Sequence, residues 1–215
     1  MTEKHSSQSI DSQSDFSASP GLIAIFAAAY QGLMHTLSVQ RNMKVHWIAG
    51  YMVMLVGMAL DFDLTVRAAL VFSVFLMLFA EILNSALEAF VDLHTRQYHY
   101  QAKLTKDAAA AGVLVLAVAV VILFADILWH NRVQILASET SIEHTLLFGL
   151  PSVVLMAVLL RLRTPVWFKH FVLIADLGLL IPLIVASKDV FFSLMAGLFV
   201  VVAYQARVAH PKGQR

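Results

Sequence analysis

The chain has no cysteine and few charged residues, and both absences limit what it can be. Without cysteine, its 215 residues hold no disulfide, thiolate nucleophile or thiolate metal ligand. Lysine, arginine, aspartate and glutamate make up 13% of the chain and leave a net charge of +1, whereas a soluble domain carries about 25% of these residues. No basic block is present either, so we expect no nucleic-acid partner.

Hydrophobic residues take the place of the missing charges. They account for 60% of the chain, and the mean hydropathy is +0.77. Such a composition cannot cover a globule with polar surface, so a bilayer is the expected solvent. We therefore predict an all-α membrane protein.

The first 20 residues differ from the rest. They are rich in Ser and Gln and contain no apolar core of signal-peptide length. We predict a disordered cytoplasmic tail over residues 1–20 that ends at Pro20-Gly21. A tail without function is the simpler interpretation.

Six apolar stretches of approximately spanning length follow this tail. They cover residues 45–60, 66–93, 107–129, 145–160, 171–187 and 190–206. A transmembrane helix needs about 20 residues, so the shortest stretches are marginal, but each is flanked by interfacial polar groups. Residues 21–39 also carry apolar residues at helical spacing, but polar residues interrupt them. That pattern favours a helix that lies in the membrane interface.

The cations indicate how these spans are oriented. With a cytoplasmic N-terminus, only Arg67, Arg132 and Lys188 of the 15 Lys and Arg residues fall in outer segments, and the other 12 fall in inner segments. An excess of cations on the inner side is the usual bias of membrane proteins. We therefore predict that both termini are cytoplasmic, in a bacterial cytoplasmic membrane.

The span 66–93 carries polar residues that a bilayer accepts only with compensation. Four of them recur along one stripe of the predicted helix: Glu81, Asn84, Glu88 and Asp92. A carboxylate at mid-membrane costs at least about 2.5 kcal/mol. The stripe could be a hydrogen-bonded seam between helices. Its rise from mid-membrane to the inner interface favours a site where a polar lipid headgroup meets a water-borne nucleotide.

Lys106 and Asp107 lie at the predicted start of the span 107–129. There a cation can meet phosphate, and an acid can hold a divalent metal or accept from free backbone N–H groups. A snorkelling lysine beside a helix N-cap is the simpler alternative. The chain has no P-loop and no Gly-rich kinase loop, so a bound nucleotide would be held by other means.

Three segments resemble the bacterial diacylglycerol kinase/undecaprenol kinase family in order and spacing: RNMKVHWIAG (41–50), EILNSALEAFVD (81–92) and YHYQAKLTKDAAAAGVL (98–114). The resemblance implies a lipid-kinase-like domain over residues 21–130, with an interfacial helix and three spans. It also implies ATP-dependent, Mg²⁺-dependent phosphorylation of a lipid hydroxyl at the cytoplasmic face, and a homotrimer. Residues 131–215 would be an additional three-span region.

The resemblance implies a role for each matching residue. Glu81 would be the general base for the lipid hydroxyl, and Asn84 would orient that base or a phosphate oxygen. Glu88 would ligate the metal. The residues that would address the nucleotide are Tyr30, Tyr98, His99, Lys106 and Asp107. These roles suit phosphoryl transfer, which depends on positioning and charge neutralisation.

Two positions depart from the family pattern. A second metal ligand, usually Glu, precedes the Arg-Asn pair, and here that position is Gln40. Its neutral carbonyl can still bind Mg²⁺, but we expect weaker binding. The segment 27–33 keeps Tyr30 but has no Arg or Lys. The alternative to an active kinase is therefore a catalytically impaired lipid-binding or scaffold membrane protein.

The acceptor lipid stays open, because diacylglycerol and undecaprenol both present a terminal hydroxyl. The arrangement of Arg41, Asn42 and His46 is similar to undecaprenol-type members. In the second half, Lys188-Asp189 echoes Lys106-Asp107, but no glutamate stripe precedes it, so we predict no second catalytic copy.

Asp176 is the one acid inside the span 171–187. It could pair with Lys169 or His170 at the inner end of the span, or bind a substrate group. A lone intramembrane acid needs a partner, and we predict a structural role for it.

Overall fold

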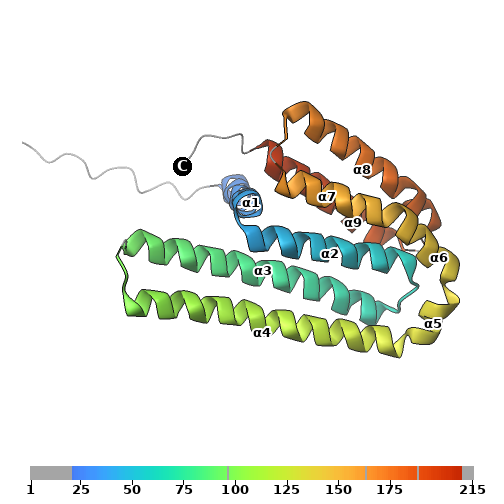
Figure 1. Cartoon of the computed structure of the whole chain (residues 1–215), viewed down its shortest axis with the longest axis horizontal. Coiled ribbons are helices and arrows are strands. Elements are labelled where there is room, and N and C mark those ends of the chain that lie inside the picture. The colour runs from blue at the N-terminus through green and yellow to red at the C-terminus, as the bar shows by residue number, and fades with distance from the viewer. Residues whose placement is uncertain (1–20, 96, 163, 188, 210–215) are drawn as a thin grey trace, which may run out of the picture. The chain divides into compact units, whose positions relative to one another are not determined.

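The computed structural model describes residues 21–95, 97–162, 164–187 and 189–209 (Figure 1). Its regular elements are all helices, with no strand among the described residues, which confirms the predicted fold class. The described residues fall into two units, one ending at Gly32 and the other beginning at Leu33. The predicted tail over residues 1–20 lies outside the described residues, and so does Lys188.

The helices follow the predicted segments, and several are longer than predicted. In chain order they are α1 (Leu22–Val39), α2 (Arg41–Ala59), α3 (Leu64–His94), α4 (Tyr100–His130), α5 (Arg132–Ala137), α6 (Glu139–His144), the π-helical turn η1 (Thr145–Gly149), α7 (Leu150–Arg161), α8 (Val166–Ala186) and α9 (Val190–Val208). The stretch from α6 through η1 to α7 forms one run of 23 residues.

Six helical segments of the described chain are long and apolar enough to cross a membrane: α1, α3, α4, Glu139–Arg161, α8 and α9. The chain is therefore a multi-pass membrane protein. The number of candidate spans agrees with the prediction of six, but their identity differs. Helix α1 is among them although it is predicted to be interfacial, and α2 is not among them although it is predicted to span the membrane. The first turns of α2 are less apolar because they carry Arg41, Lys44 and His46. The interfacial position of α1 and the cytoplasmic termini stay predictions.

Within the unit that begins at Leu33, α2 lies between two groups of helices (Figure 1). It packs against α3, which packs in turn on α4, and it also packs against α7, α8 and α9. Two glycines of α2 permit this close approach. A Cβ on Gly50 would lie 2.7 Å from Val74 of α3, and one on Gly57 would lie 2.6 Å from the Phe192 ring of α9. Small residues at such contacts are typical of membrane helices.

Gly57→Ala is expected to destabilise this unit, because the fully buried Phe192 ring would have to move. Overpacking of this kind costs about 1–3 kcal/mol, and the gain in helix propensity offsets about 1 kcal/mol of it. The matched control is Gly112→Ala in α4, where a Cβ would meet nothing within 4 Å. Thermal unfolding in detergent should give a lower Tm for the first variant only, and equal values for both would contradict the packing described.

Buried hydrogen bonds join α2 to the helices that follow residue 130. Trp47 Nε1 donates to the Phe199 carbonyl in α9 (3.2 Å). Tyr51, Ser152 of α7 and Asp176 of α8 form a hydrogen-bonded chain, and none of the three is exposed at all. The second half of the chain is thus tied to α2 through the interior of the unit.

The pairing suggested for Asp176 is wrong, although its contacts fit the predicted structural role. Asp176 accepts from Ser152, whereas Lys169 donates to the Arg207 carbonyl (2.7 Å). A hydrogen bond joins His170 Nδ1 to the Tyr204 hydroxyl (2.5 Å). Asp176 lies seven residues beyond Lys169 and six beyond His170, almost two turns further along α8, and both of those side chains are bonded elsewhere.

An ion pair ties the start of α3 to the start of α9. Arg67 contacts the carboxylate of Asp189 at 2.6 Å and that of Asp61 at 3.2 Å. Asp189 is 4% exposed, and it also caps α9 by accepting from the backbone N–H groups of Phe191 (2.8 Å) and Phe192 (3.1 Å). One buried carboxylate therefore begins a helix and holds two distant parts of the chain together.

Candidate functional site

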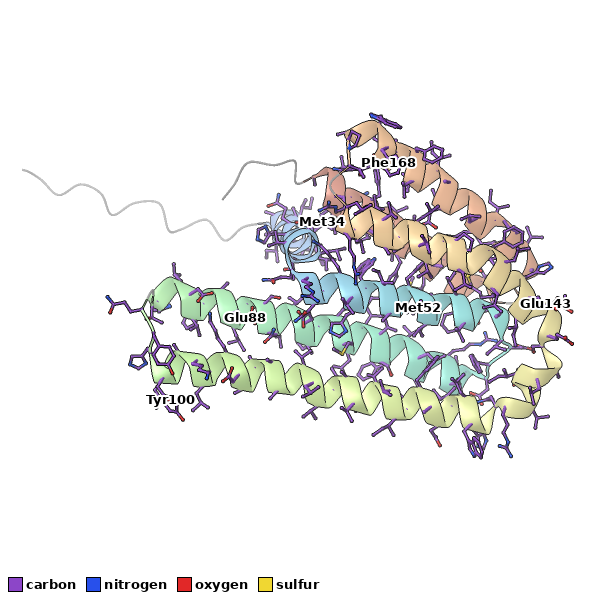
Figure 2. All side chains as sticks on the ribbon, in the orientation of Figure 1. Met34, Met52, Glu88, Tyr100, Glu143 and Phe168 are labelled. Atoms are coloured by element: carbon purple, nitrogen blue, oxygen red, sulfur yellow. The ribbon has the colours of Figure 1, made fainter. Side chains whose placement is uncertain are left out.

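The predicted polar stripe lies on α3, and its burial decreases along the helix. Glu81 is 2% exposed and Asn84 is 5% exposed, whereas Glu88 is half-buried and Asp92 is exposed. Asn84 Nδ2 donates to Glu88 Oε1 over 3.4 Å. Figure 2 shows Glu88 on α3, toward the end of the unit where Tyr100 begins α4. The stripe thus runs from the interior toward the α3–α4 connection, as the sequence predicts.

Several buried oxygen atoms of this stripe have no partner. Among the described residues, five buried side-chain atoms lack a hydrogen bond, and three of them lie within five residues of α3: Glu81 Oε2, Asn84 Oδ1 and Ser85 Oγ. Leaving such an atom unpaired costs about 1–3 kcal/mol, so each needs an explanation. Together they offer hydrogen-bonding positions to a ligand. Sequence reasoning missed Ser85, although its spacing of four residues from Glu81 places it on the same face.

Lys106 contacts the outer end of the stripe. Its Nζ lies 2.5 Å from Asp92 Oδ1, across the contact between α3 and α4. The two side chains are 35% and 65% exposed, so the pair stabilises the fold by no more than about 1 kcal/mol. Lys106 can therefore exchange Asp92 for a phosphate oxygen at little cost.

The predicted helix start at Lys106 and Asp107 is wrong. Helix α4 begins at Tyr100, and its N-cap residue is His99. Only the first four N–H groups of a helix lack an intrahelical partner, so those of Lys106 and Asp107 are already bonded. Their N-cap interpretation is excluded, and only their side chains are left to contact a ligand.

Gln40 directly precedes α2, at the level of Asn84. Gly50 of α2 packs on Val74 of α3. Gln40 lies ten residues before Gly50, and Asn84 lies ten residues after Val74. Because consecutive helices α2 and α3 run antiparallel, both positions lie about 15 Å along the axes from that contact. The described residues contain no group of three His, Cys, Asp or Glu side chains that could hold a metal, so amide oxygens would have to contribute.

Three further residues are predicted to address the nucleotide. Tyr98 and His99 are exposed in the α3–α4 connection, at the same end as Lys106. Tyr30 is exposed on the unit that ends at Gly32. The structure therefore brings Lys106 to the stripe and places Tyr98 and His99 near its outer end, while the role of Tyr30 stays a prediction.

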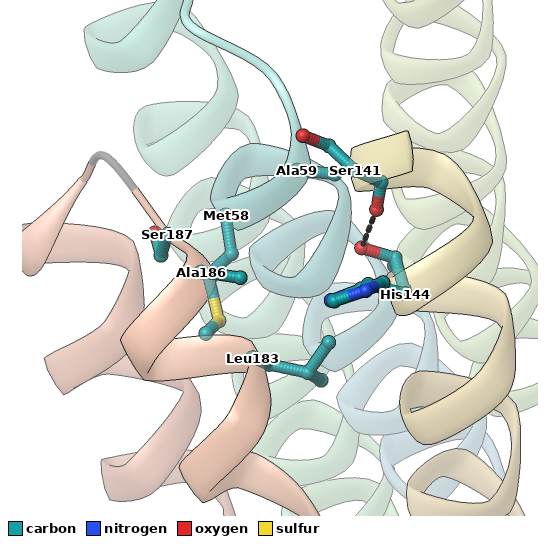
Figure 3. Close-up of a pocket in the computed structure, with 8 residues that line it drawn as sticks. Met58, Ala59, Ser141, His144, Leu183, Ala186 and Ser187 are labelled. Carbon is teal, nitrogen blue, oxygen red and sulfur yellow. Dashed lines mark hydrogen bonds between the residues drawn. The ribbon is translucent and has the colours of Figure 1, made fainter. Parts of the chain in front are cut away.

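Two hollows in the described part of the chain are too small to be the site. One lies near the end of α2, far from Gln40, and has space for about one water molecule; Figure 3 shows its lining residues, among them Met58, His144 and Leu183. A hydrogen bond from Thr145 Oγ1 to the Ser141 carbonyl (2.9 Å) lies beside it. The other is an apolar crevice between α2, α3 and α4. Neither has room for a nucleotide, and neither is lined by Glu81, Asn84 or Ser85. The stripe on α3 is the candidate site because of its buried oxygen atoms without a partner.

Comparisons with known proteins match the same part of the chain. Residues 27–128 match the family described as prokaryotic diacylglycerol kinase. The diacylglycerol kinase of Synechocystis sp. is 38% identical over 104 residues, which are 48% of this chain and 59% of that relative. The diacylglycerol kinase of Escherichia coli K12 is 34% identical over 109 residues, 50% of this chain and 89% of the relative.

A third relative, the undecaprenol kinase of Bacillus subtilis, is 34% identical over 93 residues, 43% of this chain and 76% of the relative. No solved structure gives a significant match. The match spans less than two thirds of the Synechocystis protein, but it covers most of the Escherichia coli enzyme. The family match includes the stripe from Glu81 to Asp92 together with Lys106 and Asp107. The chain therefore belongs to the prokaryotic diacylglycerol kinase family.

Proposed function

We propose that this protein transfers the γ-phosphoryl group of ATP to the terminal hydroxyl of a membrane lipid, diacylglycerol or undecaprenol. The reaction would take place at the cytoplasmic face of a bacterial cytoplasmic membrane. Its named relatives are kinases of these two lipids. One observation carries the proposal: Glu81 is a buried carboxylate with an unpartnered oxygen, on a stripe whose outer end meets Lys106.

Glu81 is the proposed general base. Its Oε2 would accept the proton of the lipid hydroxyl as the lipid oxygen bonds to the γ-phosphorus. The bond from that phosphorus to the bridging oxygen breaks, and ADP leaves with the electron pair. Glu88 is a poorer choice for the base, because it is only half-buried and accepts from Asn84. Burial of Glu81 also keeps water away from the reacting oxygen.

The nucleotide would bind at the outer end of the stripe. Lys106 would release Asp92 and neutralise phosphate charge, as cations do in phosphoryl transfer. Asp107, Tyr98 and His99 are exposed at this end, where a nucleotide arrives from water. The family resemblance also implies a nucleotide contact for Tyr30.

Magnesium is the proposed metal, and the residues fit it. Mg²⁺ prefers oxygen ligands, and here Glu88 supplies a carboxylate, Asn84 a buried amide oxygen without a partner, and Gln40 a further amide oxygen at the same level. When bound, the ion would neutralise charge on the transferred phosphate. Gln40 carries no charge, so we expect weaker binding than a glutamate would give.

Self-association is the last part of the proposal. Helix α4 packs on α3 along one face, and Ile127 is its single fully buried residue, so much of its other surface is exposed. Its apolar surface would lie against lipid or against a second copy, in a homotrimer of the kind that the family resemblance implies.

Phosphate transfer by the full-length protein in nanodiscs tests the proposal. Labelled ATP with Mg²⁺ would be offered with diacylglycerol and with undecaprenol in parallel, each with and without a chelator. We expect a labelled phospholipid from at least one acceptor, and none with the chelator. Absence of transfer to both lipids, from protein shown to be folded, would favour the alternative of a lipid-binding or scaffold protein that keeps the family core.

A further inference from the structure

We propose that Ser85 selects the acceptor: its hydroxyl donates a hydrogen bond to an ester carbonyl of diacylglycerol, and so favours a glyceride over a polyprenol. The inference rests on the proposed kinase function and assigns the substrate class of the same site. It rests on three observations: the Ser85 hydroxyl has no hydrogen-bond partner, it lies on α3 beside Glu81, and it can donate a hydrogen bond whereas the Glu81 carboxylate can only accept one.

The Ser85 hydroxyl differs from those of several Ser and Thr residues in or beside the described helices. Five Ser and Thr side chains donate to the carbonyl four residues earlier, at 2.6–2.9 Å: Ser73, Thr105, Ser138, Thr145 and Ser193. This bond is the usual way for such residues to satisfy their donor inside an apolar helix. Ser85 is 7% exposed, and its Oγ has no partner. Its O–H group is therefore available to a ligand.

Ser85 and Asn84 lie on opposite sides of Glu81. At 100° per residue, Ser85 is rotated about 40° from Glu81 in one direction and Asn84 about 60° in the other. Asn84 is bonded to Glu88, which leads to the nucleotide end of the stripe. The side of Ser85 is thus the one left for the acceptor lipid.

Glu81 and Ser85 require different groups from a ligand. The Glu81 carboxylate oxygen only accepts, so it binds the lipid hydroxyl, whereas Ser85 supplies an O–H donor four residues, or about 6 Å, further along the helix axis. Diacylglycerol carries ester carbonyls within a few bonds of its hydroxyl and can satisfy both. Undecaprenol has no oxygen besides its hydroxyl. A site that keeps a buried donor for a substrate group disfavours the analogue that lacks this group.

An ether-linked lipid tests the contact with the ester carbonyl alone, because it keeps the hydroxyl and the chains of the acceptor. Transfer from saturating Mg-ATP would be measured to a diacylglycerol and to a dialkylglycerol of the same chain length, which lacks both carbonyls. For the wild type, kcat/KM with the diester should exceed that with the diether about fivefold to tenfold, as expected for one hydrogen bond. Ser85→Ala should lose this preference by lowering the diester value alone, with KM for ATP unchanged. Ser85→Thr should keep it.

Ser73→Ala is the matched control. Ser73 is another buried serine of α3, but its hydroxyl donates to the Ala69 carbonyl (2.6 Å). The ratio of kcat/KM for the diester to kcat/KM for the diether should therefore stay at the wild-type value. If Ser85→Ala keeps the wild-type ratio, or if the wild type itself shows no preference, the role of Ser85 is overturned while the kinase function stands. A wild type that phosphorylates neither glyceride nor polyprenol would overturn both.

Discussion

Replacement of Glu81 by glutamine is expected to lower lipid phosphorylation about 10²–10⁴-fold, the usual contribution of a general base. Glutamine has nearly the same shape as glutamate, but its amide cannot take up the proton of the lipid hydroxyl. The residue is 2% exposed, and an uncharged amide is easier to bury than a carboxylate, so the fold should persist. Nanodisc kinetics should show a lower kcat with little change in KM for ATP, because Lys106, Tyr98 and His99, which are proposed to bind the nucleotide, lie toward the outer end of the stripe.

Glu143→Gln is the control for the loss of charge. Glu143 is an exposed residue of α6, at the end of the unit opposite to Tyr100 (Figure 2), and its replacement should leave the rate unchanged. Glu81→Gln protein that keeps more than a tenth of wild-type kcat would remove Glu81 from the role of base. The half-buried Glu88 would then be the next carboxylate to replace.

Asp189→Asn is expected to lower the free energy of unfolding by about 3 kcal/mol, the lower end of the range for breaking one partner out of a buried ion pair. The lower end applies because Arg67 keeps 33% of its side-chain surface exposed. Asparagine caps helices as well as aspartate does, so α9 should still begin at Val190 and the loss should isolate the contact with Arg67. For a chain of this size the apparent Tm in detergent should fall by about 6–12 °C.

Asp61→Asn provides the comparison, because Asp61 contacts the same guanidinium at 3.2 Å but is 58% exposed. Its loss should cost no more than about 1 kcal/mol. Equal shifts of Tm in the two variants would show that burial of Asp189 does not strengthen its pair. Replacement of both Arg67 and Asp189 by uncharged residues should restore part of the lost stability, since no charge is then left without a partner.

Sequence reasoning was most reliable for features that depend on the spacing of residues within one helix. The positions of α3 and its stripe followed from residue spacing, because a helix fixes which side chains share a face. Hydropathy was a poor guide to where α4 begins, since its first two turns are polar and extend beyond the apolar stretch. The partner of Asp176 could not be predicted either. Ser152 lies 24 residues away and Tyr51 a further 101, and only packing brings them together.

Ser85 shows a different limit of sequence reasoning. A serine in a membrane helix is common, and most satisfy their own hydroxyl. Its significance arises only from the missing partner and from burial beside Glu81, and neither can be deduced from residue type.

The contact of α2 with α7, α8 and α9 has a consequence for how such a chain could evolve. A chain that lost residues 131–215 would leave the Tyr51 hydroxyl without Ser152 and the Arg67 guanidinium without Asp189. Substitutions that weaken these contacts are therefore expected to reduce the stability of both halves together, so the two halves should be constrained jointly.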